Sequence, residues 1–364
     1  MALIIIGGGV VGLSVAYGLL KKGQDVIVLD GADDDFRASR GNFGLVWVQG
    51  KGADCVEYSK WSRRSAALWA DFAREIEDLT GFDLMLRQVG GMEYFTNEIE
   101  LEEQITKLES LRDASGGDYP YEALDQNELR ERVPEIGPKV VGATYCPEDG
   151  HVNPLFLLKA LSSAVRKKGG DIQTGVKVVD VLGGDGEFQV ILDDGSQLRG
   201  EKIVLSAGLG AMELGPKLGF SAPIRPQQGQ ILITEKLPEF LHYPSGTLRQ
   251  VNEGGIQIGA SKAELGLDDA EDNQTISALA RHAVDVFPHL EKVKMVRSWA
   301  ALRIMSPDGL PIYQQSDTHP GATFITCHSG VTLAAAHAGL LPDWILGKTP
   351  AYDLSTFSER RFDV

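Results

Sequence analysis

The stretch Leu3-Ile4-Ile5-Ile6-Gly7-Gly8-Gly9-Val10-Val11-Gly12 joins an apolar run to a cluster of glycines. The run at residues 3–6 predicts a buried strand of a parallel sheet. Residues 11–22 have apolar side chains at helical spacing and predict a helix. Residues 25–29 are again apolar and predict a second strand, which ends at Asp30. Strand, helix and strand within about 30 residues form a βαβ unit.

The glycines fit the GxGxxG pattern of a dinucleotide-binding turn, and Asp30 follows 18 positions after Gly12. Gly7 allows the tight turn, Gly9 lets the backbone approach a pyrophosphate, and Gly12 lets the helix pack on the strand. The helix N-terminus offers N–H groups to phosphates, and Asp30 can accept hydrogen bonds from a ribose. A plain glycine-rich turn is the alternative. The predicted cofactor-binding residues here are Gly7, Gly9, Val10, Val11, Gly12, Asp30 and Gly31.

The rest of the chain predicts more of this sheet and a second, different region. Expected helices cover residues 61–80, 98–111, 154–168, 268–287 and 332–346. Expected strands cover residues 90–95, 171–181, 189–192, 202–205, 231–234, 246–251, 255–259 and 324–326. The expected fold class is α/β plus α+β. A Rossmann-type cofactor-binding domain takes residues 1–85, 146–219 and 306–364, and a discontinuous second domain on an antiparallel sheet takes residues 86–145 and 220–305.

Composition excludes several classes of function. A net charge of −16 argues against nucleic acid as a partner. The three cysteines and seven histidines show no metal-ligand spacing, so no metal site is expected, and the cysteines fit a reducing compartment. No apolar run reaches about 18 residues, so no integral membrane span is expected. The apolar start lacks a basic segment and a cleavage site, so we expect a cytoplasmic protein.

The glycine motif alone does not separate FAD from NAD(P). The loop at residues 37–44, RASRGNFG, is rich in small and polar residues. Its backbone amides could surround a pyrophosphate and a flavin ring, which favours FAD; a solvated basic loop is the alternative.

Several motifs, taken together with the glycine turn, resemble the D-amino-acid-oxidase family of FAD proteins, which includes glycine oxidase and sarcosine oxidase. The motifs are ASRGNFG at 38–44, DGHVNP at 149–154, Ala207-Gly208 and WAALRIMSPDGLP at 299–311. The resemblance covers nearly the whole chain in the same order. HSGVTLA at 328–334 and DGHVNP are most similar to the catalytic subunits of opine and D-hydroxyproline dehydrogenases and of hydrogen cyanide synthase.

The resemblance implies where FAD is held. Ser39, Arg40, Asn42 and Gly44 would follow the pyrophosphate and flavin, and Val176 would meet the adenine. Ala207 and Gly208 would pass close to the cofactor. Ser329, Gly330, Val331 and Thr332 would approach the flavin pyrimidine, with the following helix aimed at N1. Met305 stands where sarcosine-oxidase-like members have the cysteine that links FAD, so FAD is expected to be non-covalent.

The resemblance also implies a reaction, the FAD-dependent oxidation of a small amine or amino acid. Hydride would pass from the substrate Cα to flavin N5, and the resulting imine would hydrolyse to a keto acid or aldehyde. Arg303 would hold the substrate carboxylate, because a guanidinium donates two parallel hydrogen bonds; a surface ion pair is the alternative. Arg249 is a second candidate and His328 would tune the flavin or the amine; each could instead be structural. Gln257 replaces an oxygen-activating lysine, which favours a dehydrogenase.

Two other functions stay open from the sequence. One is an NAD(P)-dependent Rossmann dehydrogenase, and the other is an electron-transferring flavin subunit of a larger complex. Three cysteines are too few for an iron–sulfur cluster held by this chain alone. The sequence also leaves open a homo-oligomer, a partner electron-transfer subunit, the substrate and its stereochemistry.

Overall fold

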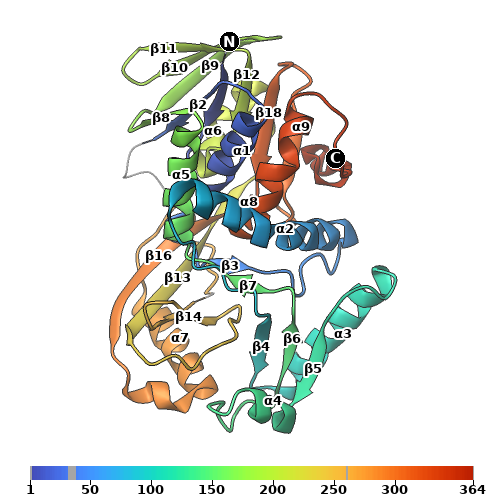
Figure 1. The fold of residues 1–364 in the computed structure, drawn as a ribbon, viewed down its shortest axis with the longest axis vertical. Coiled ribbons are helices and arrows are strands. Elements are labelled where there is room, and N and C mark those ends of the chain that lie inside the picture. The colour runs from blue at the N-terminus through green and yellow to red at the C-terminus, as the bar shows by residue number, and fades with distance from the viewer. Residues whose placement is uncertain (1, 32–37, 260, 364) are drawn as a thin grey trace.

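A six-stranded sheet forms the larger part of the fold (Figure 1). The computed structural model describes residues 2–31, 38–259 and 261–363. The strands of this sheet are β1 (Leu3–Ile6), β2 (Val26–Asp30), β8 (Asp171–Thr174), β12 (Lys202–Leu205), β17 (Ile312–Gln315) and β18 (Ala322–Thr326). Their order is β17-β18-β12-β1-β2-β8, and all neighbours pair in parallel except β17 with β18. The predicted βαβ unit therefore lies at the centre of a mainly parallel sheet.

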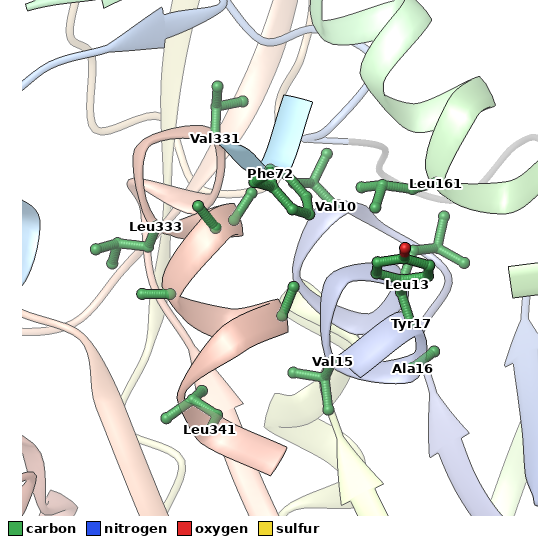
Figure 2. Close-up of a cluster of buried hydrophobic side chains, with 14 of the residues drawn as sticks. Val10, Leu13, Val15, Ala16, Tyr17, Phe72, Leu161, Val331, Leu333 and Leu341 are labelled. Atoms are coloured by element: carbon green, nitrogen blue, oxygen red, sulfur yellow. The ribbon is translucent and has the colours of Figure 1, made fainter. Parts of the chain in front are cut away.

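The first helix packs between the sheet and several other helices. These helices are α1 (Val10–Lys21), α2 (Val56–Thr80), α5 (Pro154–Lys167), α8 (Gly330–Gly339) and α9 (Leu341–Ile345). Figure 2 shows Leu13 and Tyr17 of α1 and Leu333 of α8 in one cluster, and each is at most 2% exposed. Burial of this apolar surface, at about 25 cal/mol per Å², holds the helices on the sheet.

Glycines permit the two closest approaches of α1. A Cβ on Gly12 would lie 1.9 Å from the carbonyl oxygen of Gly7, and one on Gly18 would lie 2.2 Å from the carbonyl oxygen of Ala338. Gly12 therefore lets the helix start directly above the turn, and Gly18 lets α1 contact α8.

The second region of the fold is built on antiparallel sheets. The four-stranded sheet contains β13 (Arg225–Lys236), β14 (Leu248–Gln250), β15 (Gly255–Ile258) and β16 (Met295–Met305), in the order β14-β15-β13-β16. The three-stranded sheet contains β4 (Gly91–Phe95), β5 (Glu122–Asp125) and β6 (Gly142–Cys146). The nearby helices are α3 (Glu98–Ala114), α4 (Gln126–Arg132) and α7 (Asn273–Val286). One hydrophobic core joins the two sheets, because Met92 of β4 and Leu248 of β14 belong to the same buried cluster.

Smaller elements complete the chain. They are the ribbon of β3 (Leu45–Val46) and β7 (Gly150–His151), the sheet of β9 (Val178–Gly184), β10 (Glu187–Leu192) and β11 (Gln197–Gly200), and the short α6 (Ala211–Leu214). The β3–β7 ribbon lies between the two regions in Figure 1. The expected fold class is confirmed, while the exact domain boundaries stay a prediction.

Several elements differ from the sequence-based expectation. The single strand expected at 171–181 is two strands in different sheets, because Gly175 turns the chain with a φ of 74°. The helix expected at 332–346 is divided into α8 and α9, and Pro342 lies in the first turn of α9, where its missing N–H costs nothing. The helix expected from residue 268 begins only after Asp272, whose side chain accepts the N–H groups of Gln274 and Thr275.

Strand β16 was not predicted from the sequence. It pairs with β13 from Met305↔Arg225 to Met295↔Thr234. Most of its residues are exposed or half-buried, so they do not give the alternating pattern of a half-buried strand. No helix within the described ranges is long and apolar enough to cross a membrane.

Candidate active site

A cleft of about 660 Å³ opens where the parallel strands end. Its walls include residues that follow β1, β2, β12 and β18, the loop at 38–43, and parts of β13 and β16. In sheets of this kind, ligands bind outside the carboxyl ends of the strands. The cleft brings together most of the residues that the sequence proposed, namely Gly7, Gly9, Val10, Val11, Asp30, Ser39, Arg40, Asn42, Ala207, Gly208, Arg303, His328, Ser329, Gly330, Val331 and Thr332.

The glycine turn is shaped for a close backbone approach. A Cβ on Gly7, whose φ is 111°, would lie 2.4 Å from the carbonyl oxygen of Ser206, and a Cβ on Gly9 would lie 2.9 Å from Ser39 Oγ. Side chains would therefore fill the cradle above β1. The N–H of Gly8 donates to Asp30 Oδ1 at 3.0 Å, which fixes the carboxylate beside the turn. This strand–turn–helix fits a dinucleotide pyrophosphate with an acidic residue at the ribose.

The loop at 38–43 forms the next part of the wall. The Oγ of Ser39 accepts the N–H of Val10 at 3.0 Å and so ties the loop to the start of α1. Asn42 Oδ1 accepts the N–H of Gly44 at 2.7 Å, and Gly44 itself has a φ of 91°. A Cβ on Gly41 would lie 2.3 Å from the Cβ of Ala301, so loop and β16 meet closely. Arg37, which the sequence grouped with this loop, lies outside the described residues.

Four proposed cofactor residues do not line the cleft in the same way. Gly12 and Gly44 lie behind it, supporting the turn and the loop. The N–H of Gly175 donates to the carbonyl of Gly31 at 3.2 Å, and the N–H of Val176 donates to that of Asp30 at 3.1 Å. Val176 is thereby held beside the end of β2, where an adenine beyond the ribose would lie. The cofactor role of these residues stays a proposal.

The start of α8 forms a polar end of the cleft. Lys51 Nζ donates to Ser329 Oγ at 2.8 Å and to Thr332 Oγ1 at 3.0 Å, and Tyr58 OH donates to Ser329 Oγ at 2.9 Å. Burial lowers the pKa of Lys51 to about 8, while the Asp149 carboxyl opposes this shift. A cationic side chain and the positive end of a helix dipole therefore lie together here, which suits negative charge on a bound group.

His328 faces the cleft beside this helix start, with its Nδ1 3.2 Å from Ser329 Oγ. Burial, and then the charges of Lys51 and Arg303, hold the pKa of His328 well below its ordinary value. The imidazole is therefore neutral near pH 7.

Arg303 reaches the cleft from β16. Its Nη1 donates to the carbonyl of Gln228 at 3.2 Å and to that of Ser261 at 2.9 Å. Its guanidinium lies over Gly229, where a Cβ would be 2.5 Å from Nη1. Burial lowers the pKa of Arg303, and no described carboxylate forms an ion pair with it. The surface ion pair that the sequence left as an alternative is not what these residues show.

The structure does not bring Arg249 into the cleft. It lies on β14, 3% exposed, with Nη1 3.1 Å from His151 Nδ1, and it lines a second cavity. Conversely, Lys51, Glu93 and Lys262 line the cleft, although the sequence analysis did not propose them. Each is a single charged residue outside any motif, so only the folded chain shows that it faces the site. Among the described residues, no cluster of three or more His, Cys, Asp or Glu side chains is placed to hold a metal ion.

The fold and the cleft define a dinucleotide-dependent oxidoreductase. The chain belongs to the DAO family, described as FAD dependent oxidoreductase, which matches residues 2–344. It is thus an FAD-dependent enzyme related to amine and amino-acid oxidases, and the NAD(P) alternative is not supported.

Similar proteins agree with this assignment. One of the subunits of opine oxidase from Rhizobium meliloti is 41% identical over 99% of this chain and 97% of its own length. The corresponding opine oxidase polypeptide of Agrobacterium tumefaciens (strain Ach5) is 42% identical over 98% and 96%. The crystal structure of glycine oxidase from Geobacillus kaustophilus shares the fold, with a TM-score of 0.91 at 24% identity over 98% of this chain and 97% of that one.

Proposed function

We propose that this enzyme oxidises a carboxylated amine, either an amino acid or an N-substituted amino acid of the opine type. The observation that carries the proposal is the Arg303 guanidinium, which lies in the cleft without an ion pair among the described residues. A buried cation with only carbonyl partners is suited to a substrate carboxylate. The similarity to two opine oxidase polypeptides supports the N-substituted class.

In this proposal the chain binds and orients both molecules. The turn from Gly7 to Gly12 and Asp30 would hold the ADP half of FAD, and the start of α8 would face the flavin ring. When bound, FAD supplies the hydride acceptor for the substrate Cα–H. Arg303 fixes the carboxylate and thereby directs Cα towards the ring. Neutral His328 adds no positive charge where the substrate ammonium has to lose a proton.

We further propose that the protein works as part of a complex and passes electrons to an acceptor other than oxygen. Both opine oxidase relatives are named as single subunits of that enzyme, and Gln257 replaces the lysine of oxygen-activating relatives. Slow oxygen consumption together with fast anaerobic flavin reduction by the same substrate would support this. Oxygen uptake as fast as flavin reduction would contradict it.

Replacing Arg303 with Met tests the substrate assignment. Anaerobic flavin reduction is first screened with glycine, sarcosine, D- and L-amino acids, prolines and opines. For the best carboxylated substrate, Arg303→Met should raise KM about 30-fold or more, because losing a buried charged partner costs at least about 2 kcal/mol. KM for a simple amine should change only a few-fold.

Arg297→Met is the matched control, since Arg297 is an exposed arginine on the same strand. It should leave both KM values unchanged. Equal effects of Arg303→Met on carboxylated and simple amines would refute the role of Arg303, and absence of flavin reduction by any amine would refute the proposed reaction.

A further inference from the structure

A second cavity of about 550 Å³ lies next to the cleft but has a different floor. Arg40 and Asn42 line both spaces, so the loop at 38–43 separates them. Arg249 of β14, Gln257 of β15 and Trp299 of β16 line the second cavity and do not line the cleft. The cavity is therefore built on the four-stranded sheet.

Two buried polar side chains face each other in this cavity. Arg249 and Gln257 are paired across β14 and β15, and they are 3% and 4% exposed. Within the described part of the chain, Arg249 Nε and Gln257 Oε1 have no hydrogen-bond partner. A buried donor or acceptor left without a partner costs roughly 1–3 kcal/mol, so such groups are usually satisfied by a ligand or water.

The charge of Arg249 is also uncompensated. Its neighbour His151 is neutral near pH 7, because burial and then the Arg249 charge lower the pKa of His151 to about 3. Burial lowers the pKa of Arg249 to about 9, which leaves it protonated at neutral pH, and Glu253 at the exposed rim opposes that shift. No described carboxylate forms an ion pair with Arg249. A buried cation of this kind is strongly destabilising unless an anion accompanies it.

We propose that the second cavity binds an organic acid that also carries a hydroxyl or amino group. Its carboxylate or phosphate pairs with Arg249, and its hydroxyl or amino group donates to Gln257 Oε1. The volume exceeds that of an inorganic ion, and Trp299 with Ile233 gives the organic body an apolar wall. The inference depends only on these residues and not on the function proposed for the cleft.

The test is calorimetric titration of the FAD-loaded Arg303→Met protein, in which the cleft's own anion-binding arginine is absent. The probes are 3-phenyllactate, which carries a carboxylate, a hydroxyl and a ring, and phenyl phosphate. Adding Arg249→Met should weaken binding of the preferred probe about 30-fold or more, and adding Gln257→Leu should weaken only the hydroxy acid, about 5- to 10-fold. Comparison of the two probes shows whether a carboxylate or a phosphate is preferred.

Adding Arg297→Met, which removes an exposed arginine of β16, is the control and should leave binding unchanged. The flavin spectrum and the melting midpoint of each variant show whether it is folded. If Arg249→Met fails to fold, Gln257→Leu and Arg249→Lys provide the same comparison, since Lys keeps the charge but loses the planar pair of donors. Failure of both probes to bind, or binding that ignores both residues, would overturn the proposal.

Discussion

Two carboxyl groups beside the cleft show what single residues contribute. Glu93 lines the cleft and accepts the N–H of Gly246 at 3.1 Å. Asp149 is fully buried and accepts the N–H groups of Val48 at 2.5 Å and Gln49 at 3.2 Å. Burial, and then the Asp149 charge, raise the pKa of Glu93 to about 7. Burial likewise raises the pKa of Asp149 to about 7, against the hydrogen bonds from Val48 and Gln49.

The raised pKa of Glu93 predicts a pH dependence of stability. Between its usual value of 4.5 and about 7, the folded chain keeps a proton that the unfolded chain has released, so the unfolding free energy falls as pH rises through this window. Glu93→Gln removes the ionisation but keeps an oxygen for Gly246. The variant should therefore gain stability relative to the parent at pH 8 and little at pH 4.5, as measured by urea denaturation midpoints.

Glu102→Gln provides the comparison, because Glu102 is an exposed glutamate on α3. Its difference from the parent should be the same at both pH values. A Glu93→Gln difference that does not grow with pH would show that the Glu93 carboxyl is not held protonated by the fold.

At the scale of elements, α2 holds α8 in place. Ser65 of α2 is fully buried; its Oγ donates to the carbonyl of Thr332 at 2.7 Å and accepts the N–H of Ala336 at 3.1 Å. Trp69 Nε1 donates to the same Thr332 carbonyl at 3.0 Å. These bonds fix α8 so that its first turn faces the cleft.

Ser65→Ala should lower the free energy of unfolding by roughly 1–3 kcal/mol, because it removes two buried hydrogen bonds between helices. Urea denaturation followed by circular dichroism measures the change. Ser110→Ala is the matched variant: Ser110 is exposed on α3 and its Oγ donates to the carbonyl of Thr106 within the same helix. A loss for Ser65→Ala no larger than that for Ser110→Ala would mean that α2 does not anchor α8.

At the scale of the whole molecule, the cleft joins parts of the chain that are far apart in sequence. Its walls come from the parallel sheet, the loop at 38–43 and the four-stranded sheet. A ligand held there contacts the folded arrangement and not the unfolded chain, so FAD should stabilise the entire protein by mass action.

Removal of FAD should therefore lower the midpoint of thermal unfolding, and added FAD should restore it. At 100 times Kd the expected gain in unfolding free energy is about 2.7 kcal/mol. ADP at the same concentration should give a smaller increase, because it contacts only the turn near Asp30.

Two glycine variants make this test specific. A valine at Gly9 would press on Ser39 Oγ and fill the turn, so FAD should no longer raise the midpoint of Gly9→Val. Gly339→Ala, at an open position near the end of α8, should respond to FAD like the parent. An unchanged response of Gly9→Val would place FAD somewhere other than this turn.

The sequence was informative wherever a local pattern has one structural meaning. The βαβ unit, the glycine turn and the N-cap at Asn153 before α5 depend on neighbouring residues, and all were visible in the amino-acid order. Strand β16 and the break between β8 and β9 depend on pairing with distant strands, which local periodicity does not record.

By itself the sequence determined the cofactor class, the fold class and the position of Arg303 in a recognisable motif. Only the tertiary structure decided that Lys51 and Glu93 enter the cleft, that Arg249 leaves it, and that Arg249 meets Gln257 in a separate cavity. The physical reason is that backbone turns and helix starts are set by nearby residues, whereas burial, charge compensation and free hydrogen-bonding atoms are properties of segments that meet only after folding.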